Sequence, residues 1–546
     1  MTSTAPPRGP GTDREVSSSG GAVDVIGRLY RPDPMYGRVV SVAVVGMNGR
    51  LLAVEAHIGR GLPSLSITGL PGSTIQDARD RIRPAVERAG LQWPLRRIVV
   101  NFSPGNVRKE GPGLDLPLAA CVLAASGQAP GTRLDRYAFF GELSLEGSLV
   151  PTPGALSVAL AASGAGLEGV VVPSGNAAEA AMVDGLRVVA ATTLADVVGF
   201  LRGSWTPPEV PPARADRASV RSGVDFDEVR GQGIARRALE VAAAGGHNVL
   251  LVGPPGAGKT MLARRLATVL PTLTKGESLE VTQLRSVAGL LGSGEIAVGR
   301  PFRSPHHSIS MSGLLGGGSG SGWFRPGEVS LAHHGVLFLD ELTEFRRDAL
   351  EGLRQPLEDG KIRITRAGGS VEYPTGFTLV AAANPCPCGF EGDPRGCACP
   401  ANRIEAYRQR LSGPLLDRID IRLTIPRLTK LELLGEVPGE PSEAIRRRVE
   451  AARIRQRGRC GGVGVSCNAR LPGPAARRLA DLSTPARELL ARAVETFELS
   501  GRGFDRALKV ARTIADLDAS ARVSADHLSE ALGYRGPADG GFARAG

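Results

Sequence analysis

Apolar and polar residues follow two periodicities along the chain. Between residues 38 and 201, short runs rich in Val, Ile and Leu alternate with Ala-rich runs of helical spacing, and the same alternation resumes between 225 and about 426. The first block predicts strands at 39–45, 51–58, 97–101, 169–172 and 187–190. After residue 443 the pattern predicts helices at 443–456, 474–482, 486–497, 505–517 and 524–532. The chain is therefore predicted to be an α/β multidomain protein with a helical C-terminal part.

Segments rich in Pro, Gly and Ser separate these blocks. With 546 residues the chain is too long for one hydrophobic core, so two to four domains are expected. The N-terminal segment lacks the apolar run of a signal peptide and is predicted to be disordered. The predicted segments are a tail (1–35), an α/β domain (36–202), a linker (203–224), a second α/β domain (225–430), a helical domain (431–535) and a tail (536–546).

Composition changes this interpretation little. Apolar residues make up 42% and charged residues 22%, as in soluble globular proteins. No stretch approaches the ~20 apolar residues that cross a bilayer, so we expect a cytoplasmic protein without a membrane partner. The formal charge of +11 permits a polyanionic partner such as DNA, although an Arg-rich, Gly-rich composition also reflects a GC-rich genome.

A glycine-rich loop follows a short apolar strand in the second α/β block. The sequence His247-Asn-Val-Leu-Leu-Val continues into Gly-x-x-x-x-Gly-Lys-Thr and then into a helical run. Loops of this kind wrap phosphate oxygens with backbone N–H groups, and the following helix presents its positive end. The residues predicted to bind ATP are Gly253, Pro254, Pro255, Gly256, Ala257, Gly258, Lys259 and Thr260. Lys259 is expected to reach the β- and γ-phosphates, and Thr260 to help hold Mg²⁺.

Two further strand patterns end in polar residues. Val336-Leu-Phe-Leu precedes Asp340 and Glu341, and a second apolar run from Phe377 ends at Asn384. After a phosphate-binding loop, such acids are expected to hold Mg²⁺ (Asp340) and to activate water (Glu341). The amide of Asn384 is expected to orient that water, or alternatively to serve only as a turn residue before Pro385.

These strand ends, in this order, resemble the AAA+ ATPase superfamily. Ser412-Gly-Pro-Leu-Leu-Asp-Arg418-Ile-Asp resembles the arginine-finger segment of its magnesium-chelatase and MCM branch. The resemblance implies that Arg418 reaches a γ-phosphate bound by a neighbouring subunit. Ser500-Gly-Arg502 resembles the sensor-2 arginine of that branch, with Arg506 as the alternative.

Further motifs resemble one family of this branch, the YifB/ComM family. They are Asp227-Glu-Val-Arg-Gly-Gln, Arg300-Pro-Phe-Arg-Ser-Pro-His-His, Gly316-Gly-Gly, Pro326-Gly-Glu-Val-Ser-Leu-Ala-His-His-Gly, Asn384-Pro-Cys-Pro-Cys-Gly and Ala511-Arg-Thr-Ile-Ala-Asp-Leu. The resemblance implies a homo-oligomer, a hexameric ring motor that drives helicase or branch-migration activity on single-stranded or branched DNA during recombination of incoming DNA. The alternatives are a magnesium-chelatase-type ATPase subunit and a regulatory ATPase that remodels proteins.

The N-terminal block carries a second resemblance. Lys109-Glu-Gly-Pro-Gly113-Leu-Asp115 and Gly141-Glu-Leu-Ser-Leu-Glu-Gly are similar to the proteolytic domain of Lon proteases. In that alignment the nucleophilic Ser corresponds to Gly113 and the Lys approximately to Leu156. Since neither residue can act as nucleophile or base, we expect the fold without the peptidase.

Four of the seven cysteines form two Cys-x-Cys pairs, Cys386/Cys388 and Cys397/Cys399. Four thiolates from two short loops suit a structural Zn²⁺, although the Cys-x-Cys spacing is tighter than the usual Cys-x-x-Cys. Free or redox-active thiols are the alternative. The pairs His306/His307 and His333/His334 are candidate ligands, with capping or interface roles as the alternative.

Two basic segments are candidates for DNA contact. Residues 360–374 predict a β-hairpin with a turn at Gly368-Gly369, in which Lys361, Arg363 and Arg366 contact a threaded phosphate backbone or form a solvated face. The predicted helix that begins at 443 carries seven arginines between 446 and 459, for which a solvated face is expected rather than a DNA contact.

Overall fold

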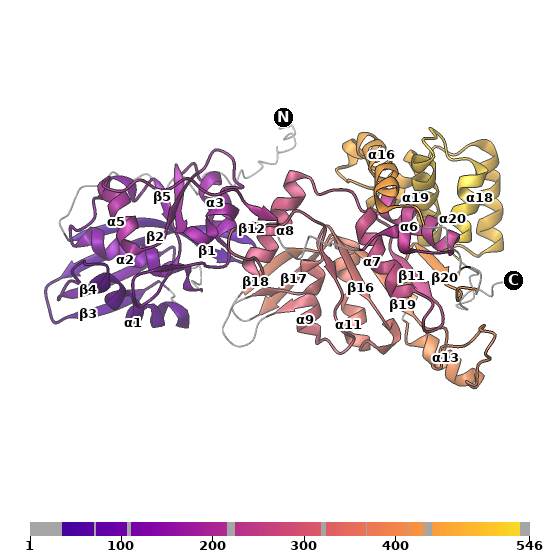
Figure 1. The fold of residues 1–546 in the computed structure, drawn as a ribbon, viewed down its shortest axis with the longest axis horizontal. Coiled ribbons are helices and arrows are strands. Elements are labelled where there is room, and N and C mark those ends of the chain that lie inside the picture. The colour runs from indigo at the N-terminus through magenta and orange to yellow at the C-terminus, as the bar shows by residue number, and fades with distance from the viewer. Residues whose placement is uncertain are drawn as a thin grey trace, which may run out of the picture. The chain divides into compact units, whose positions relative to one another are not determined.

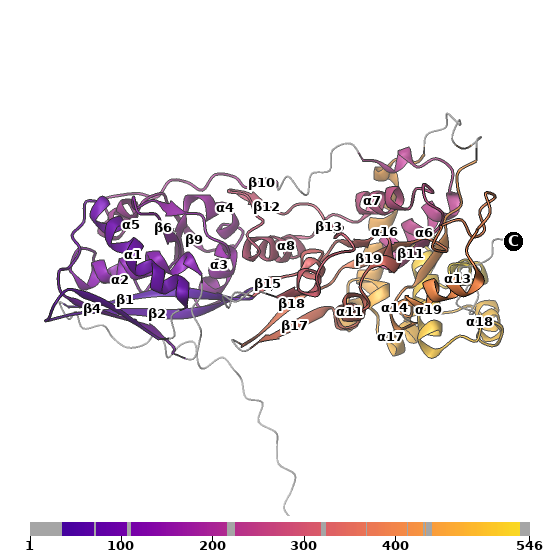
Figure 2. The ribbon, with the colours of Figure 1, turned by 90° about the horizontal axis from the view of Figure 1, so that it is seen from below.

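The computed structural model describes residues 35–69, 72–105, 111–215, 224–317, 324–366, 369–411, 413–429, 432 and 439–535. The chain forms two compact units, which are described separately (Figures 1 and 2). Unit 1 comprises residues up to 43, 49–152 and 158–210, and unit 2 comprises 44–48, 153–157 and the chain from 211 onward. Predictions for the tails before Met35 and after Arg535, for residues 216–223 of the linker, for Gly368 and for Ser412 lie outside the described residues.

Unit 1 is built on a seven-stranded sheet with helices. Its strands are, in spatial order, β3 (Ser64–Thr68), β4 (Arg97–Ser103), β2 (Asn48–Gly59), β1 (Tyr36–Val45), β5 (Tyr137–Phe139), β8 (Gly169–Pro173) and β9 (Arg187–Ala191). A two-stranded sheet joins β6 (Glu142–Leu143) to β7 (Leu149–Val150). The helices are α1 (Ser73–Arg88), α2 (Asp115–Ala125), α3 (Ala155–Gly164), α4 (Ala177–Ala180) and α5 (Leu194–Arg202). All five strands predicted from the sequence are present, each extended by one to three residues at one end or both.

A five-stranded parallel sheet forms the centre of unit 2. Its order is β20 (Ile421–Thr424), β11 (Val249–Val252), β19 (Thr378–Ala383), β16 (Val336–Leu339) and β13 (Phe302–Arg303). The strands β11, β16 and β19 are buried throughout, as expected for a parallel sheet that is covered on both faces. The accompanying helices are α6 (Gly233–Gly245), α7 (Lys259–Val269), α8 (Lys275–Val287), α9 (Met311–Leu315), α10 (Glu328–Leu331), α11 (Arg347–Gly352), α12 (Arg354–Asp359), α13 (Ala401–Gln409) and α14 (Gly413–Leu416).

Short strand pairs complete the α/β part of unit 2. They are β10 (Arg214–Ala215) with β12 (Glu295–Ile296), β14 (Gly316–Gly317) with β15 (Arg325–Pro326), and the hairpin of β17 (Lys361–Arg366) and β18 (Gly369–Pro374). The predicted linker thus contributes a strand, because Arg214 and Ala215 pair with β12 in parallel.

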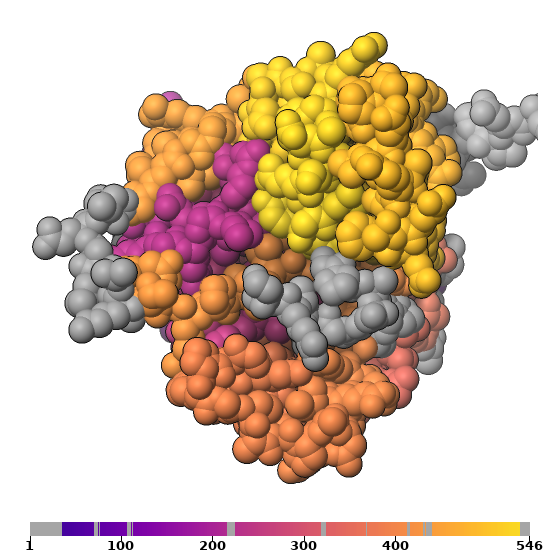
Figure 3. All heavy atoms as spheres, turned by 90° about the vertical axis from the view of Figure 1, so that its right-hand side faces the viewer, coloured from indigo at the N-terminus to yellow at the C-terminus, as the bar shows by residue number. Residues whose placement is uncertain are grey.

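Five helices follow the sheet: α16 (Ser442–Cys460), α17 (Gly473–Leu479), α18 (Thr484–Thr496), α19 (Gly501–Leu517) and α20 (Ala525–Gly533). The helices α16, α18, α19 and α20 share one hydrophobic core with α6, α7 and the sheet, whereas Ala475 and Ala476 of α17 pack with Cys460 and Leu471. The helical part is therefore not a separate compact unit. In Figure 3 the yellow surface of the last helices borders the magenta surface of α6, while the orange segment around α13 projects separately. The α/β multidomain fold with a helical C-terminal region is therefore confirmed.

The arginines of α16 differ in how far they contact the neighbouring helices. Arg446 donates to the carbonyl of Thr268, Arg453 to that of Ala243, and Arg448 forms ion pairs with Glu240 and Glu440. Arg447, Arg448, Arg455 and Arg457 are nevertheless exposed, as a solvated face predicts, whereas Arg446 and Arg453 are only partly exposed. They anchor α16 to the helices beside it, because the planar guanidinium can satisfy several acceptors at once.

Asp516 of α19 is a deeply buried acceptor of this network. Its side chain is 1% exposed and receives two hydrogen bonds from Arg459 (2.6 and 2.8 Å), with further ones from Arg512 and Asn468. Arg512 is also buried, at 3% exposure. The carboxylate therefore neutralises two guanidinium groups that solvent cannot reach freely.

We predict that Asp516→Asn destabilises unit 2 by about 3 kcal/mol or more, because it leaves buried positive charge without its partner. Calorimetric thermal unfolding measures the shift. Glu488→Gln, at an exposed position on α18, is the matched control and should change stability by no more than about 0.5 kcal/mol. Equal midpoints for the two variants would contradict the assignment.

Candidate nucleotide-binding site

Three parallel strands deliver the predicted site residues to one edge of the unit 2 sheet. Val252 of β11 is in register with Ala383 of β19, and Leu339 of β16 is in register with Ala381. The carboxyl ends of these strands therefore lie together, which is the edge where ligands bind in open α/β sheets. Each strand is followed directly by predicted site residues: β11 by the loop 253–260, β16 by Asp340 and Glu341, and β19 by Asn384.

The loop 253–260 depends on glycine at two positions. At Gly253 a Cβ atom would lie 2.3 Å from the carbonyl oxygen of Ile425, so only glycine fits between β11 and the end of β20. Gly258 has φ +89° and directly precedes α7, where an L side chain would be strained. The loop therefore turns tightly into the N-terminus of α7, and this arrangement suits phosphate oxygens.

Lys259 points back across the loop. Its Nζ donates to the carbonyls of Gly253 (2.6 Å) and Pro254 (3.1 Å) and to Oδ1 of Asn384 (3.1 Å). Burial lowers the pKa of this ammonium, and the nearby charges of Asp340 and Glu341 act against that effect. The structure thus brings Lys259 and Asn384, which are 125 residues apart, into direct contact.

The two acids after β16 occupy different positions. Oγ1 of Thr260 donates to Oδ2 of Asp340 at 2.7 Å, so the hydroxyl and carboxylate expected to share Mg²⁺ lie side by side. Glu341 has φ +52°, an uncommon conformation for a glutamate, and its side chain is 56% exposed. It points to Nδ1 of His307, 3.2 Å from Oε2.

Sequence reasoning missed two contacts of this site. His307 was considered as a metal ligand or a capping residue, but its described partner is Glu341. Gln232 donates from Nε2 to the carbonyl of Ala257 at 2.9 Å and so supports the phosphate-binding loop. Gln232 and His307 are each the last residue of a motif that carried the family resemblance. Their residue types alone, however, gave no reason to predict a contact with Ala257 or Glu341.

Arg418 lies at the opposite edge of the sheet from the loop of its own chain. Asn248, the residue before β11, donates from Nδ2 to the carbonyl of Arg418 at 2.8 Å. The loop 253–260 begins only beyond the other end of β11, and a four-residue strand spans about 13 Å. The Arg418 guanidinium instead forms an ion pair with Glu358 of α12 and is only 11% exposed.

Arg502 and Arg506, the two candidates for the sensor-2 arginine, differ in their ion-pair partners and in their exposure to solvent. Arg502 is 61% exposed and lies 3.4 Å from the same Glu358 carboxylate. Arg506 is 12% exposed and lies 3.5 Å from Asp420, which also binds His247 at 3.3 Å. Although burial acts to raise it, the pKa of Asp420 is lowered by the hydrogen bond with His247 and by nearby cationic groups. This arrangement gives Arg506 an internal role and favours Arg502 as the arginine available to a ligand.

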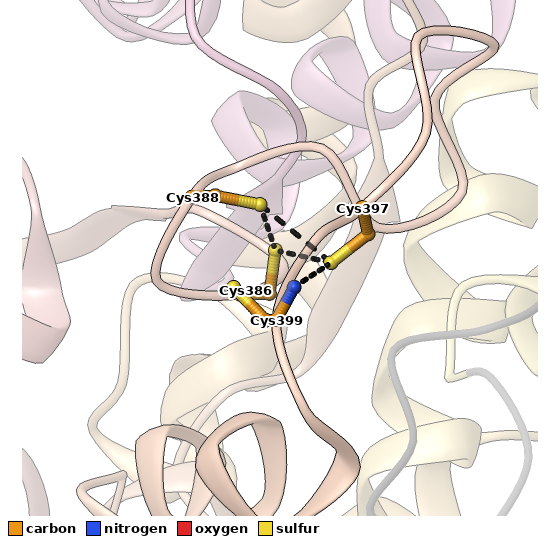
Figure 4. A group of neighbouring side chains, drawn as sticks. All are labelled: Cys386, Cys388, Cys397 and Cys399. Atoms are coloured by element: carbon orange, nitrogen blue, oxygen red, sulfur yellow. Dashed lines mark hydrogen bonds between the residues drawn. The ribbon is translucent and has the colours of Figure 1, made fainter.

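The two cysteine pairs converge (Figure 4). The Sγ atoms of Cys386, Cys388 and Cys397 lie 3.4–3.6 Å apart, and those of all four cysteines lie within 4.8 Å of one another. Zn–S bonds of about 2.3 Å in a tetrahedron place the sulfurs about 3.8 Å apart, so the thiols are suitably spaced for a shared ion. A backbone hydrogen bond from Phe390 lowers the pKa of Cys388 to about 6. The pKa of Cys397 is raised to about 12 despite a backbone hydrogen bond from Cys399, because burial and hydrogen bonds with the other thiols disfavour its thiolate.

The turn between the cysteine pairs packs on the phosphate-binding loop. A Cβ atom at Gly389 would lie 2.6 Å from Cδ of Pro255. Arg427 joins the two segments, because it donates to the carbonyl of Pro255 (2.9 Å) and forms an ion pair with Asp393 (2.9 Å). The cysteine cluster is therefore structurally continuous with the candidate site.

The β17–β18 hairpin distributes its cations on two faces. Lys361 and Arg363 both form ion pairs with Glu372 of β18, at 3.0 and 3.3 Å. Arg366 lies an odd number of residues from both, and hence on the other face of the hairpin, against Gly317. The structure brings Lys361 and Arg363 together but separates them from Arg366.

His333 and His334 bind one carboxylate oxygen of Glu280, at 2.9 and 2.6 Å. The backbone N–H of Gly376 donates to Nδ1 of His333 at 2.8 Å, so Nε2 carries the proton and donates to Glu280. This group links α8 to the starts of β16 and β19, and the ligand atoms of Glu280, His333 and His334 are close enough to share a metal ion.

The two positions aligned with Lon catalytic residues are structural. A Cβ atom at Gly113 would lie 2.1 Å from the ring of Phe140, so no side chain fits there without rearrangement. Leu156 is fully buried in α3. Neither position presents a reactive group.

The class of the protein follows from its similarity to known sequences. The family described as magnesium chelatase, subunit ChlI, matches residues 225–433. Two related descriptions, subunit ChlI of Mg-chelatase and its C-terminal part, match 54–176 and 439–535. These matches define the class as a magnesium-chelatase-like AAA+ ATPase.

Three relatives align over nearly the whole chain. An uncharacterized protein of Mycobacterium tuberculosis is 45% identical over 505 residues, which cover 91% of this chain and 98% of that protein. YifB of Escherichia coli is 42% identical over 496 residues (90% and 96%), and the competence protein ComM of Haemophilus influenzae is 41% identical over 502 (91% and 97%). The chain belongs to the YifB/ComM family.

A partial similarity concerns Lon protease of Mycolicibacterium smegmatis, which is 29% identical over 174 residues, or 30% of this chain and 22% of that protein. This agrees with the predicted Lon-like similarity. Within the described ranges, none of the helices has both the length and the apolar character needed to cross a bilayer.

We predict that Lys259→Ala abolishes ATP binding, because it removes the cation that the loop directs toward phosphate. Glu341→Gln should retain binding and lower the hydrolysis rate by about 10²-fold or more, the usual contribution of a general base. Binding of a fluorescent ATP analogue and phosphate release measure the two effects separately. Near-normal turnover by Glu341→Gln would exclude Glu341 as the base.

Proposed function

We propose that this protein is an ATP-driven ring motor that acts on single-stranded or branched DNA, with helicase or branch-migration activity in the recombination of incoming DNA. In this proposal the loop 253–260 binds ATP, Asp340 and Thr260 hold Mg²⁺, Glu341 activates water and Asn384 orients it. Arg418 acts on a neighbour's γ-phosphate, and Arg502 is the sensor-2 arginine. The competence protein ComM is the relative whose name supports a role in DNA uptake.

The observation that carries the DNA assignment is the connection between the hairpin and the nucleotide site. After β18 the chain runs through residues 375–377 into β19, which ends beside Asn384. Asn384 contacts Lys259, so one short segment links exposed cations to the predicted phosphate-binding residues. Lys361 and Arg363 are 54% and 65% exposed, and their charge suits a phosphate backbone.

The test compares ATP hydrolysis without DNA and with single-stranded, duplex and four-way-junction DNA. DNA-stimulated hydrolysis is the expected result. A rate that no DNA changes would instead favour the magnesium-chelatase-type or protein-remodelling alternatives.

The hairpin gives a sharper prediction. Lys361→Ala with Arg363→Ala should reduce the log–log salt slope of DNA binding by roughly 1.5, since each lost contact with a single strand removes about 0.7. Adding Arg366→Ala tests whether the opposite face contributes. Fluorescence anisotropy at several salt concentrations measures the slope, and basal hydrolysis should persist because none of these residues contacts the nucleotide site.

Two variants control this experiment. Glu372→Gln should strengthen DNA binding, because its carboxylate competes with phosphate for Lys361 and Arg363. Arg487→Ala, at an exposed position on α18, should leave the slope unchanged. An unaltered slope in the hairpin variants would remove the hairpin from the mechanism.

The proposed ring, most simply a hexamer, requires sites shared between subunits. Arg418 lies at the sheet edge opposite its own loop, which supports action in a neighbouring subunit. Arg418→Ala and Lys259→Ala should each be inactive alone, whereas mixtures should regain part of the ATPase activity because intact half-sites can meet. Phosphate release from mixtures of proteins shown to exchange subunits measures this, and mixtures as inactive as the single variants would rule out the shared site.

We further propose that Cys386, Cys388, Cys397 and Cys399 hold one structural Zn²⁺. Four thiolates leave no open position, so the ion would stabilise the turn without entering the chemistry. Elemental analysis of protein purified without chelators should give about one zinc per chain, and Cys388→Ser with Cys397→Ser should release it. Cys121→Ser, at a buried cysteine of unit 1, is the control. Metal-free unmodified protein would support free thiols instead.

The segments 36–202, 225–430 and 431–535 are proposed as the Lon-protease-like, nucleotide-binding and lid domains of this motor. The first would retain a Lon-like fold without peptidase activity, since Gly113 and Leu156 occupy the catalytic positions.

A further inference from the structure

One carboxylate holds both the proposed arginine finger, Arg418, and the proposed sensor-2 arginine, Arg502. Arg418 follows α14 and Arg502 lies in the first turn of α19, yet both guanidinium groups approach Oε1 of Glu358. Arg418 is mostly shielded from solvent, with 11% of its side chain exposed, so its ion pair is less screened than a surface pair. Two segments that are 84 residues apart in sequence thus converge on α12.

Glu358 sits where α12 meets the β17–β18 hairpin. The helix ends at Asp359, Gly360 reverses the chain with φ +64°, and β17 begins at Lys361. At the other end of the hairpin, Thr375 donates from its backbone N–H to the carbonyl of Gly360 (2.8 Å) and from Oγ1 to that of Pro356 (3.1 Å). Both ends of the hairpin are therefore attached to the last turn of α12, which carries Glu358.

We propose that Glu358 is a positioning residue that holds Arg418 and Arg502 and couples the neighbour's nucleotide state to the DNA hairpin. When ATP occupies the neighbouring site, its γ-phosphate competes with the Glu358 carboxylate for the two guanidinium groups. Release of the arginines frees the last turn of α12, and the attached hairpin shifts with it. This inference rests on the proposed function, because it requires a ring in which Arg418 acts in a neighbouring subunit.

The competition between the Glu358 carboxylate and the γ-phosphate predicts the direction in which a Glu358 variant changes activity. A singly charged carboxylate that holds two cations stabilises the arrangement in which they do not contact nucleotide. Glu358 therefore lowers the fraction of subunits whose arginines engage the neighbour's nucleotide, also at saturating ATP. Removing its charge while keeping its size should favour engagement even without DNA.

The experiment compares Glu358→Gln with Glu351→Gln. Glu351 lies on the adjacent α11 and pairs with Arg347 and Arg354 but with neither arginine that Glu358 holds, so it matches the charge change. Steady-state hydrolysis should show a DNA-free kcat about two- to fivefold higher for Glu358→Gln, the range expected for loss of one partly exposed ion pair, with little change in KM. Glu351→Gln should behave as the unmodified protein does.

Two further measurements separate positioning from a structural role. Glu358→Asp, which keeps the charge, should retain the low DNA-free kcat. DNA affinity should differ between ADP and a non-hydrolysable ATP analogue in the unmodified protein, and this difference should fall to within about twofold in Glu358→Gln.

The inference is overturned if Glu358→Gln matches Glu351→Gln in DNA-free kcat, or if it only loses activity and assembly. Failure of the proposed function is distinguishable from this outcome. A protein that hydrolyses ATP without any response to DNA would refute the DNA motor, while the DNA-free kcat values would still decide whether Glu358 restrains Arg418.

Discussion

The side-chain amide of Asn248 bonds to both strands that flank β11. Its Oδ1 accepts the backbone N–H of Leu379 in β19 at 2.8 Å, and its Nδ2 donates to the carbonyl of Arg418 just before β20. These two bonds help fix the register of three parallel strands. That register decides which residues meet at the carboxyl edge, where Lys259 contacts Asn384, and which remain at the amino edge, where Arg418 lies. Both halves of the proposed shared site therefore depend on one amide.

The sequence was sufficient for the parts of this protein that depend on local patterns. Alternation of apolar runs gave the strands, and a glycine-rich loop between strand and helix gave the candidate site, because parallel strand ends must meet at one edge. The sequence alone therefore predicted that Asp340, Glu341 and Asn384 belong to the same site as Lys259. The contacts of His307, Gln232 and Glu358 could not be inferred in this way, because they join segments whose relative position only tertiary packing determines.

The arginines of α16 also show that the sequence does not reveal which partners a side chain will have in the folded protein. Seven of them on one helix suggested a surface exposed to water, since charged residues are rarely buried. The exposure of Arg447, Arg448, Arg455 and Arg457 agrees with this prediction. Arg446 and Arg453 are partly covered because α16 packs against α6 and α7, whose backbone carbonyls accept their hydrogen bonds. A guanidinium buried against carbonyls and a guanidinium in solvent have the same sequence signature. Only the positions of neighbouring acceptor groups in the folded protein distinguish a buried guanidinium from an exposed one.

The turn between the cysteine pairs has a practical consequence for anyone who handles this protein. Gly389 packs on Pro255, and Arg427 bonds to both segments, so the turn and the phosphate-binding loop share one scaffold. A thiol oxidant that acts on the cysteines, or a chelator that removes the proposed zinc, would therefore disturb the loop through this shared scaffold. It would lower the amount of protein competent to bind nucleotide without entering the nucleotide site. Choice of reducing agent and chelator in storage buffers thus becomes a variable in every affinity measurement on this enzyme.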